Sequence, residues 1–529
     1  MEGRIHPRCD HGIVGARPHH AAALPSAGRR RYKGVACDRG RPLPSTTKSR
    51  SLAVVVLAAG KGKRLKSKLP KVLQPVCGRP SLWHVLKAAG AARPSRIIVV
   101  VGHGAERVEE AVRSWGLTPE PVFVDQGDPR GTGHAVAAAE KAVGTASDVL
   151  VMAGDDPLVE GRHVRGVLSL HRRSKAAATV LTSLVDDPTG YGRVVREGSA
   201  FHAIVEESDA SAETASIDEI STLVYAFRRE ELYRVLPLVG KENRQREYYL
   251  PDTLGILRDK GERVSALLGD FETWAGVNSR ASIATVSQCM RDRINARHLD
   301  NGVSIIDPAQ TYIDVDVRIG ADTVVHPLTF LEGDTRIGAS CEIGPSTRIR
   351  DSRIGDGAEV TFAVVRGARI GPRASVGPFA SLRPGTVLDE GAKAGTFVEI
   401  KASRVGAGSK VPHLTYVGDA TIGRNTNVGA ATVTVNYDGY EKHPTVIGDD
   451  VRIGSDTMLV APVRIGKGAV TGAGSVITKD VPPGALAVER VEQRVVPGYR
   501  KRKDAERASS DAAGASGATK KRRSRKPTT

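Results

Sequence analysis

Residues 317–344 read VRIGADTVVHPLTFLEGDTRIGASCEIG, and in this stretch an aliphatic residue followed by glycine returns at multiples of six positions. Similar pairs recur up to about residue 480, at Ile319-Gly320, Ile337-Gly338, Ile343-Gly344, Val405-Gly406, Val417-Gly418, Ile447-Gly448, Ile453-Gly454 and Ile465-Gly466. A period of six fits neither a helix nor the alternation of a single strand. It is typical of a β-solenoid in which each six-residue unit forms one face and three faces make one coil. We therefore predict a β-helix over residues 305–492, with a glycine-rich β-sandwich of accidental spacing as the alternative.

The sequence before the repeats has a different pattern. Over residues 51–278, apolar β-branched runs alternate with helix-compatible stretches, which predicts an α/β domain with a Rossmann-like, mostly parallel sheet. We expect strands at 53–59, 96–101 and 149–153, and helices at 81–90 and 133–143. Few glycines interrupt residues 279–299, so the segment 279–304 is predicted to be a linker helix between the two domains.

The positive charge of the chain is concentrated at its ends. The formal net charge is +18, and residues 1–50 and 500–529 each hold 11 basic and 3 acidic side chains. The region between them is therefore close to neutral, which argues against a specific nucleic-acid partner. Neither end has apolar periodicity, so we expect residues 1–50 to be disordered or wrongly included in the translation, and residues 493–529 to form a disordered basic tail. Weak, salt-sensitive binding of this tail to nucleic acid or an anionic membrane surface is the alternative.

The cysteines and apolar runs give no sign of export. The five cysteines are scattered and show no CxxC spacing, which supports neither a disulfide framework nor a zinc site. The apolar run Leu52–Ala59 is much shorter than the roughly 20 residues of a membrane span. Basic and proline residues also break any signal-peptide core in residues 1–50. These features predict a cytoplasmic protein without a membrane partner.

A glycine-rich, basic segment follows the first predicted strand. Residues 57–73 read LAAGKGKRLKSKLPKVL, in which Gly60 and Gly62 allow the backbone to approach a ligand closely. The nearby cations suit a triphosphate and are Lys61, Lys63, Arg64 and Lys71. The alternative is an ordinary strand-to-helix turn with solvated lysines. The fuller pattern of AAG, Gly62, Arg64 and Leu69-Pro70-Lys71 is more selective, and it resembles the sugar-nucleotide pyrophosphorylase family.

This resemblance implies a uridylyltransferase site. In the order expected for that branch follow the strings FVDQGDPRGTGHA, VLVMAGDDPL, DDPTGYGR, AIVEESDA, REYYLPD and AGVNSR. By resemblance, Arg64 and Lys71 are catalytic and stabilise charge on the α-phosphate of UTP. The residues implied to bind UTP or the product UDP-N-acetylglucosamine are Leu57, Ala58, Ala59, Gly60, Lys71, Gln126, Gly131, Thr132, Gly192, Glu206, Ser221 and Asn278. Gln126, Gly131 and Thr132 would select uracil, because a buried pyrimidine edge needs amide and backbone partners.

Asp155 and Asn278 are the predicted metal ligands. Asp155 follows the strand 149–153, at the edge where open α/β sheets bind ligands. A lone Asp there is more often a cap or turn residue, but with Asn278 and the family context we expect both oxygens to hold Mg²⁺. The expected reaction is in-line attack of a sugar-1-phosphate oxygen on the α-phosphorus of UTP, with pyrophosphate leaving.

The chain also departs from the family at several positions. Lys63 stands where the family commonly has Thr, Ser221 where it has Asn, and Leu223 where it has Gly. Ala153 replaces a Tyr that some members carry. These changes affect the predicted sugar end more than the nucleotide end.

The repeat region carries a second set of polar residues. The strings LRPG, FVEIKAS, KVPHLTYVGDA, NVGAATVTVNYDG, GSDTMLVAP and GAGSVI resemble the acetyltransferase half of the bifunctional bacterial uridylyltransferase/acetyltransferase family. His413 matches that family's general base, although a lone histidine would more often be a surface residue. An imidazole, with an ordinary pKa of about 6.5, can accept the proton of an attacking amine near neutrality.

The same resemblance assigns the remaining residues of the second site. Those implied to bind glucosamine-1-phosphate are Arg383, Lys401, Tyr416 and Asn427. Those implied on the acetyl-CoA side are Ala430, Asn436, Tyr437, Ser455, Ala473 and Arg490, with Asn436 also matching a position that orients the hexosamine and Lys442 a further group near the phosphates. The family also implies a left-handed parallel β-helix that assembles as a homotrimer.

Three functional hypotheses remain from the sequence. The first is the bifunctional enzyme, whose resemblance covers about residues 52–492. The second keeps the uridylyltransferase but makes the solenoid a regulatory or oligomerising module, against which His413, Arg383 and Lys401 argue. The third is a regulatory or nucleic-acid-linked protein with an inactive transferase fold, against which Arg64 and Lys71 argue.

Overall fold

The computed structural model describes residues 50–271 and 274–522, with side chains described up to residue 512. The expectations for residues 1–49 lie outside this part of the chain. Within it, no helix combines the length and the hydropathy needed to cross a membrane.

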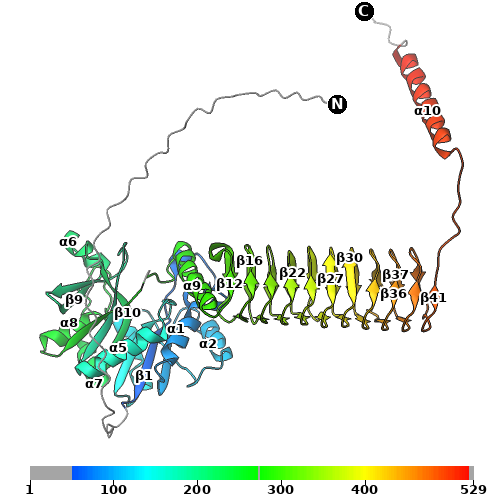
Figure 1. The fold of residues 1–529 in the computed structure, drawn as a ribbon. Coiled ribbons are helices and arrows are strands. Elements are labelled where there is room, and N and C mark those ends of the chain that lie inside the picture. The colour runs from blue at the N-terminus through cyan, green and yellow to red at the C-terminus, as the bar shows by residue number, and fades with distance from the viewer. Residues whose placement is uncertain (1–49, 272–273, 523–529) are drawn as a thin grey trace, which may run out of the picture. The chain divides into compact units, whose positions relative to one another are not determined.

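The first domain is built on a nine-stranded sheet with the main order β11-β7-β10-β6-β1-β4-β5 (Figure 1). Neighbours among β6, β1, β4 and β5 are parallel, whereas β10 runs antiparallel between β6 and β7. The strands are β1 (Leu52–Leu57), β4 (Arg96–Val101), β5 (Val122–Asp125), β6 (Asp148–Ala153), β7 (Ala178–Leu184), β8 (Arg193–Glu197), β9 (Ala200–Val205), β10 (Glu219–Arg228) and β11 (Val264–Leu268). The Rossmann-like, largely parallel architecture is therefore confirmed, with an antiparallel extension.

The helices of this domain pack on both faces of the sheet. Two separate apolar clusters line the two faces, because alternate residues of each strand point in opposite directions. The helices are α1 (Ser81–Gly90), α2 (Ala105–Ser114), α3 (Thr132–Ala138), α4 (Glu140–Val143), α5 (Gly161–Ser174), α6 (Ala212–Ala215), α7 (Arg229–Val235) and α8 (Asp252–Asp259). The single helix expected over 133–143 is wrong, because the chain forms the two short helices α3 and α4, separated by Ala139.

The linker helix α9 (Arg280–Asp300) begins immediately beside a predicted site residue. The side chain of Ser279 caps it by accepting a hydrogen bond from Ser282 N at 3.1 Å. The Ser282 hydroxyl accepts in turn from Asn278 N at 2.9 Å and from Ser279 N at 2.8 Å. The start of α9 therefore fixes the backbone at Asn278.

The second domain is a solenoid of short parallel strands from β12 (Ser304–Ile305) to β41 (Leu486–Ala487). They form three sheets of 11, 10 and 9 strands, in which each strand pairs with the equivalent strand of the next coil. Ile319, Ile337, Ile354 and Ile370 stack in register, and their side chains enter one continuous apolar column. This architecture, consistent with a left-handed parallel β-helix, confirms the interpretation of the six-residue period.

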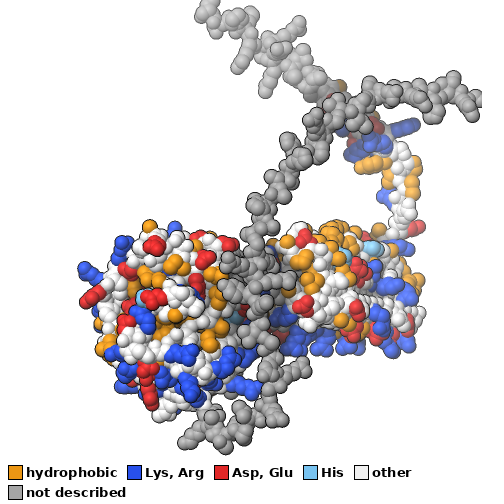
Figure 2. All heavy atoms as spheres, turned by 60° about the vertical axis from the view of Figure 1, so that its left-hand side comes forward, with side chains coloured by type: hydrophobic (Ala, Val, Ile, Leu, Met, Phe, Trp, Pro, Cys, Tyr) orange, Lys and Arg blue, Asp and Glu red, His pale blue; other side chains and the backbone are white. Residues whose placement is uncertain are grey.

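The outward positions of the same strands are polar. Arg318, Arg336, Arg353 and Arg369 stack in register beside the buried isoleucines. A row of Lys and Arg side chains along one edge of the β-helix is visible in Figure 2. Outward charge and inward isoleucine alternate as strand geometry requires.

The basic tail differs from the sequence prediction. Residues Tyr499–Arg522 form helix α10, where no regular structure was expected. Its side chains from 499 to 512 are all exposed, so no core supports it. Its frequent Ala, Arg and Lys residues favour a helix by intrinsic propensity alone, and the prediction of a disordered tail underestimated this propensity.

Candidate active sites

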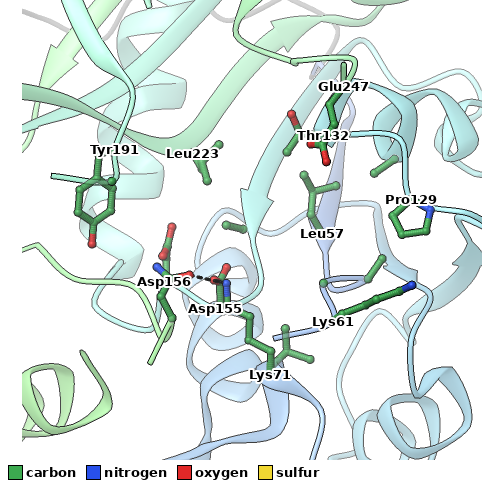
Figure 3. A pocket seen from close by; sticks show the side chains of 18 of the residues that line it. Leu57, Lys61, Lys71, Pro129, Thr132, Asp155, Asp156, Tyr191, Leu223 and Glu247 are labelled. Carbon is green, nitrogen blue, oxygen red and sulfur yellow. Dashed lines mark hydrogen bonds and ion pairs between the residues drawn. The ribbon is translucent and has the colours of Figure 1, made fainter. Parts of the chain in front are cut away.

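A pocket of about 450 Å³ opens at the carboxyl ends of β1 and β6 (Figure 3). Strand β1 ends at Leu57, and the chain then forms the 3-10 helices η1 (Lys63–Leu65) and η2 (Lys71–Leu73) beside the pocket. Its lining includes Leu57, Ala59, Gly60, Lys61, Arg64, Lys71, Gln126, Pro129, Gly131, Thr132, Ala153, Asp155, Asp156, Tyr191, Ser221, Leu223, Glu247, Trp274 and Asn278. Most of the predicted nucleotide residues thus meet in one place. Ala58, Gly192 and Glu206 lie outside this lining.

Lys71 joins the two predicted metal ligands. Its ammonium donates to Asn278 Oδ1 at 2.7 Å and forms an ion pair with Asp155. Arg64 Nη2 donates to the same Asn278 oxygen at 3.4 Å. Gly62, in the left-handed region at φ 58°, permits this packing, because a Cβ there would lie 2.9 Å from Lys71 Cβ. The cations of Lys71 and Arg64 and the side-chain oxygens of Asp155 and Asn278 therefore converge on the floor of the pocket.

Asp156 is a pocket residue that the sequence analysis missed. It is buried beside Asp155, and burial first, then the Asp155 carboxylate, raises its pKa well above the ordinary value, while Lys71 acts in the opposite direction. A Cβ on Gly276 would lie 2.6 Å from Asp156 Oδ1, so glycine is needed there to admit the carboxyl group. The signal was present, since Asp156 directly follows the chosen Asp155 in VLVMAGDDPL.

The predicted uracil residues form one end of the pocket. Gln126 follows β5 and donates from Nε2 to Gly131 O at 3.1 Å. Gly131 adopts φ 109° with no room for a Cβ, which would lie 2.5 Å from Tyr248 O. Thr132 opens α3, and its hydroxyl accepts from Leu250 N at 2.9 Å. These contacts hold the side-chain amide of Gln126 and the backbone at Gly131 in the wall of the pocket, where a ligand can approach both closely.

The opposite end contains Tyr191, Ser221 and Leu223. Ser221 Oγ and Tyr225 OH share a buried hydrogen bond of 2.7 Å, and Ser221 N donates to Gly192 O at 2.9 Å. Glu206 lies behind Gly192, whose Cβ would be 3.3 Å from Glu206 Oε1. Burial and then the nearby Asp252, Asp209 and Glu247 carboxylates raise the pKa of Glu206 to about 7.

Several other lining residues were not singled out from the sequence. Tyr191 belongs to the quoted string DDPTGYGR, and its hydroxyl accepts from Gly276 N at 3.2 Å. Glu247, from the quoted string REYYLPD, and Trp274, which lies in none of the quoted strings, also line the pocket. Of the expected cations, Lys61 lines the pocket. Lys63 is exposed and lies outside the lining.

On the β-helix, two of the predicted sugar-phosphate residues, Arg383 and Lys401, lie at one end of a sheet. Leu382 at the end of β25 (Ala380–Leu382) pairs with Ile400 of β28 (Glu399–Lys401), so Arg383 and Lys401 follow at equivalent positions in successive coils. Lys401 Nζ contacts Asp419 at 3.0 Å, and Asn436 Nδ2 donates to the same carboxylate at 2.5 Å. The hydrogen bond to the Asp419 carboxylate raises the pKa of Lys401, and the neighbouring Lys401 lowers the pKa of Lys442.

The general-base candidate and three of the predicted acetyl-CoA residues lie in one column. His413 ends β30 (Lys410–His413) and is exposed. Its carbonyl oxygen accepts from Ala431 N at 3.3 Å, Ala430 O accepts from Asp456 N at 2.6 Å, and Ser455 O accepts from Gly474 N at 2.9 Å. The column comprises His413, Ala430, Ser455 and Ala473, one residue from each successive coil. In each of these hydrogen bonds, the donor is the residue that directly follows the next member of the column. Arg490 Nη1 extends it by donating to Ala473 O at 3.4 Å.

The remaining predicted residues are distributed over two sheets. Tyr416 starts β31 (Tyr416–Gly418), three residues after His413, and a Cβ on Gly418 would lie 2.4 Å from its hydroxyl. Asn427 instead pairs with Lys410 and Arg452 on the sheet that contains β30. Tyr437 is exposed and donates to Gly439 O at 2.6 Å. Within one chain, the structure therefore does not bring Asn427 to the Arg383–Lys401 cluster.

Comparisons with known proteins agree with this two-part layout. Residues 54–216 match the MobA-like NTP transferase domain, and residues 444–479 match the bacterial transferase hexapeptide (six repeats). The bifunctional protein GlmU of Streptomyces coelicolor is 49% identical, with 86% of this chain and 95% of that protein covered. The Streptomyces avermitilis protein of the same name is 48% identical with the same coverage, and that of Syntrophomonas wolfei is 46% identical over 84% of this chain and 99% of its own length.

The chain belongs to the bifunctional GlmU family. It is a transferase, with a nucleotidyltransferase domain followed by an acyltransferase-type hexapeptide domain. The resemblance inferred from the sequence motifs is confirmed, and nucleotide and acetyl-CoA substrates follow from membership of this family. The two clusters described above lie in the two halves that define a GlmU chain.

Proposed function

We propose that this chain acetylates glucosamine-1-phosphate with acetyl-CoA and then transfers UMP from UTP to the resulting N-acetylglucosamine-1-phosphate. The products are UDP-N-acetylglucosamine, a precursor of cell-wall polymers, and pyrophosphate. The observation that carries the proposal is that the same chain holds two separate sets of polar groups, Lys71 with Asp155 and Asn278 in the first domain, and Lys401 with Asp419 and Asn436 in the second.

In the uridylyl transfer, the chain supplies positive charge and orientation. Lys71 and Arg64 lie where a triphosphate between the Gln126 end and the Tyr191 end would place its phosphates. Their charge stabilises the α-phosphate as the sugar phosphate attacks and pyrophosphate leaves, and no covalent intermediate is needed. Gln126 and Gly131 hold the uracil, and the chain at Ser221 and Tyr191 receives the sugar.

Asp155 and Asn278 fit a magnesium ion. Both of their side-chain oxygens contact the single ammonium of Lys71, so they are directed at one point and attract a cation. The described residues contain no cluster of three or more His, Cys, Asp or Glu side chains arranged to hold a metal ion by themselves. Mg²⁺ needs few protein ligands because it keeps waters and binds substrate phosphates. When bound, it would neutralise phosphate charge.

In the acetyl transfer, His413 accepts the proton of the attacking amine. Arg383 and Lys401 provide a guanidinium and an ammonium for the sugar phosphate, and Tyr416 follows His413 by three residues. The column of small residues beyond His413 exposes backbone for the pantetheine arm of acetyl-CoA, with Arg490 near its phosphates. Since UTP and acetyl-CoA are intracellular metabolites, we place both reactions in the cytoplasm.

A homotrimer formed through the β-helix is part of the proposal. Exposed apolar side chains stack along one corner of the solenoid, at Phe362, Phe379, Phe397 and Leu414, with ring centroids 5.6 Å apart for the first pair and 5.3 Å for the second. Phe379 and Phe397 are 56% and 58% exposed, which is unusual for a contiguous apolar row on a monomer. Since this row ends next to His413, association there would also let Asn427 of one copy approach the sugar-phosphate cluster of another.

One experiment tests both activities separately. Purified protein is supplied with glucosamine-1-phosphate, acetyl-CoA, UTP and Mg²⁺, and free thiol and pyrophosphate are measured in parallel. We expect thiol release without UTP, and pyrophosphate release only when acetyl-CoA or pre-acetylated sugar phosphate is present. Pyrophosphate release without thiol release would support the uridylyltransferase and reduce the solenoid to an oligomerising module.

A further inference from the structure

Leu223 adopts a backbone conformation that leucine disfavours. It has φ 54°, in the left-handed region, and sits in a bulge of β10 where the pairing with β7 shifts between Ser221 and Tyr225. An L residue with a branched side chain is strained there, whereas glycine is not. Such a conformation in a half-buried strand residue indicates that the surrounding structure holds this side chain in place.

The position of β10 in the sheet places Leu223 at the sugar end of the pocket. Val224 pairs with Met152, so Leu223 lies beside the carboxyl end of β6, next to the strand that leads to Asp155. Across the sheet, the order is β10, β6, β1, β4 and β5, which carries Leu223, Asp155, the Lys71 segment and Gln126 in that sequence. Because the phosphates occupy the middle and the base occupies the Gln126 end, the sugar must lie on the β10 side.

The side chain faces the pocket. Leu223 is part of the pocket lining and also packs against the apolar cluster on that face of the sheet. Figure 3 shows Leu223 above Asp155, with Tyr191 to the left of both and Thr132, Pro129 and Lys61 to the right. Its neighbours at this end include the hydroxyl groups of Ser221 and Tyr191 and the small side chain of Ala153, so Leu223 is a bulky aliphatic residue of this wall.

Resting on the function proposed above, we propose that Leu223 is a specificity-determining residue that limits the size of the N-acyl group on the sugar phosphate accepted by the uridylyltransferase. The isobutyl group closes the sugar end against substituents larger than acetyl. The strained backbone of the bulge presents it to the pocket. Its role is steric and requires no charge or proton transfer.

The test separates the side chain from the backbone. Leu223→Ala removes the wall and keeps the strained conformation, whereas Leu223→Gly removes both. We expect both variants to raise kcat/KM for N-butyrylglucosamine-1-phosphate relative to the N-acetyl substrate by about tenfold or more, the usual effect of one or two methylene groups in a pocket. The KM for UTP and the rate of thiol release should stay as in the wild type.

Lys175→Gly is the matched control. Lys175 is also in the left-handed region, at φ 50°, but it caps α5 away from the pocket, so its replacement relieves strain without touching the sugar end. Far-UV circular dichroism and Leu223→Met, which keeps the side-chain volume, check that the variants fold. Unchanged acyl selectivity in both Leu223→Ala and Leu223→Gly, or a change in Leu223→Gly alone, would overturn the inference. If the wild type itself releases no pyrophosphate, the proposed function fails rather than this role of Leu223.

Discussion

The Nζ atom of Lys71 lies 2.7 Å from Oδ1 of Asn278, a residue 207 positions farther along the chain. Lys71 follows the glycine-rich turn after β1, and Asn278 precedes the linker helix α9. The first domain thus closes its pocket with the last residue before the linker. This contact ties phosphate binding to the junction with the β-helix.

Replacing Lys71 should affect one activity only. In Lys71→Met, the α-phosphate loses an ammonium group and the Asp155 and Asn278 oxygens lose their shared partner. We expect pyrophosphate release to fall about 10²–10³-fold, as for the loss of one charge-stabilising donor. Thiol release, measured on the same preparation, should be unchanged. A parallel loss of both rates would indicate a folding defect.

Asp155→Asn tests the magnesium site. The substitution keeps the shape of the side chain but removes the charge that attracts a divalent cation. Saturation of the uridylyl rate should then require at least tenfold more Mg²⁺, an estimate from the loss of one charged ligand. Titration of initial pyrophosphate release against Mg²⁺ measures this shift. An unchanged Mg²⁺ dependence would contradict the assignment.

His413→Ala tests the general base. Acetyl transfer should fall about 10²–10⁴-fold, the usual range for losing such a group. Release of free thiol from acetyl-CoA measures this rate. Because His413 is exposed and lies outside the apolar column, the thermal midpoint should not change. Acetylation at the wild-type rate would require another proton acceptor.

The raised pKa of Glu206 predicts a pH dependence of stability. Its folded-state pKa of about 7 exceeds its ordinary value of 4.5, so the folded state binds this proton more tightly than the unfolded state does. The resulting stabilisation is complete below pH 4.5 and is lost as pH rises through about 7. Thermal melts of Glu206→Gln across this range should show a flatter decline than the wild type. Equal slopes would show that Glu206 is not the group responsible for the decline.

The aromatic corner of the β-helix predicts the oligomeric state. Phe379→Asp places a charge in the middle of the exposed apolar row and should convert trimers to monomers in sedimentation experiments. Leu268→Asp, at a 50% exposed residue of the first domain, is the control and should leave the trimer intact. A wild type that sediments as a monomer would refute assembly through this corner.

Periodicity predicted the parts of the fold whose pattern is strong. The helix over 81–90 and the strand over 96–101 coincide with α1 and β4, and the isoleucines of the repeat stack as the six-residue period required. The predictions for the short helices and for the tail were wrong. At α3, α4 and α10 no long apolar face marks the helix in the sequence, so local propensity and capping determine where it forms.

Site residues could be predicted where they belong to a sequence motif. They were harder to predict where only a tertiary contact brings them into the site. Lys71 and Asn278 were chosen separately by motif, and their 2.7 Å contact follows only from the fold. Asp156 was passed over because its burial depends on the missing Cβ of Gly276, 120 residues away. The left-handed conformation of Leu223 is not indicated by leucine itself, which disfavours it, but only by the Gly that the resembling family has at this position.

The two ends of the β-helix are unequal. At the first, α9 covers the coil, and its buried Asn295 donates from Nδ2 to Pro308 O at 3.0 Å and to Thr311 O at 3.3 Å. At the last, β41 pairs with β39 (Val470–Thr471) alone among the strands of the described residues, and Leu486 is 67% exposed. Because each coil is stabilised only by its immediate neighbours, such a solenoid behaves as a one-dimensional chain of units. Opening should therefore start at β41 and advance toward α9, so amide protons should exchange with solvent in a gradient that is fastest at the carboxyl-terminal coils.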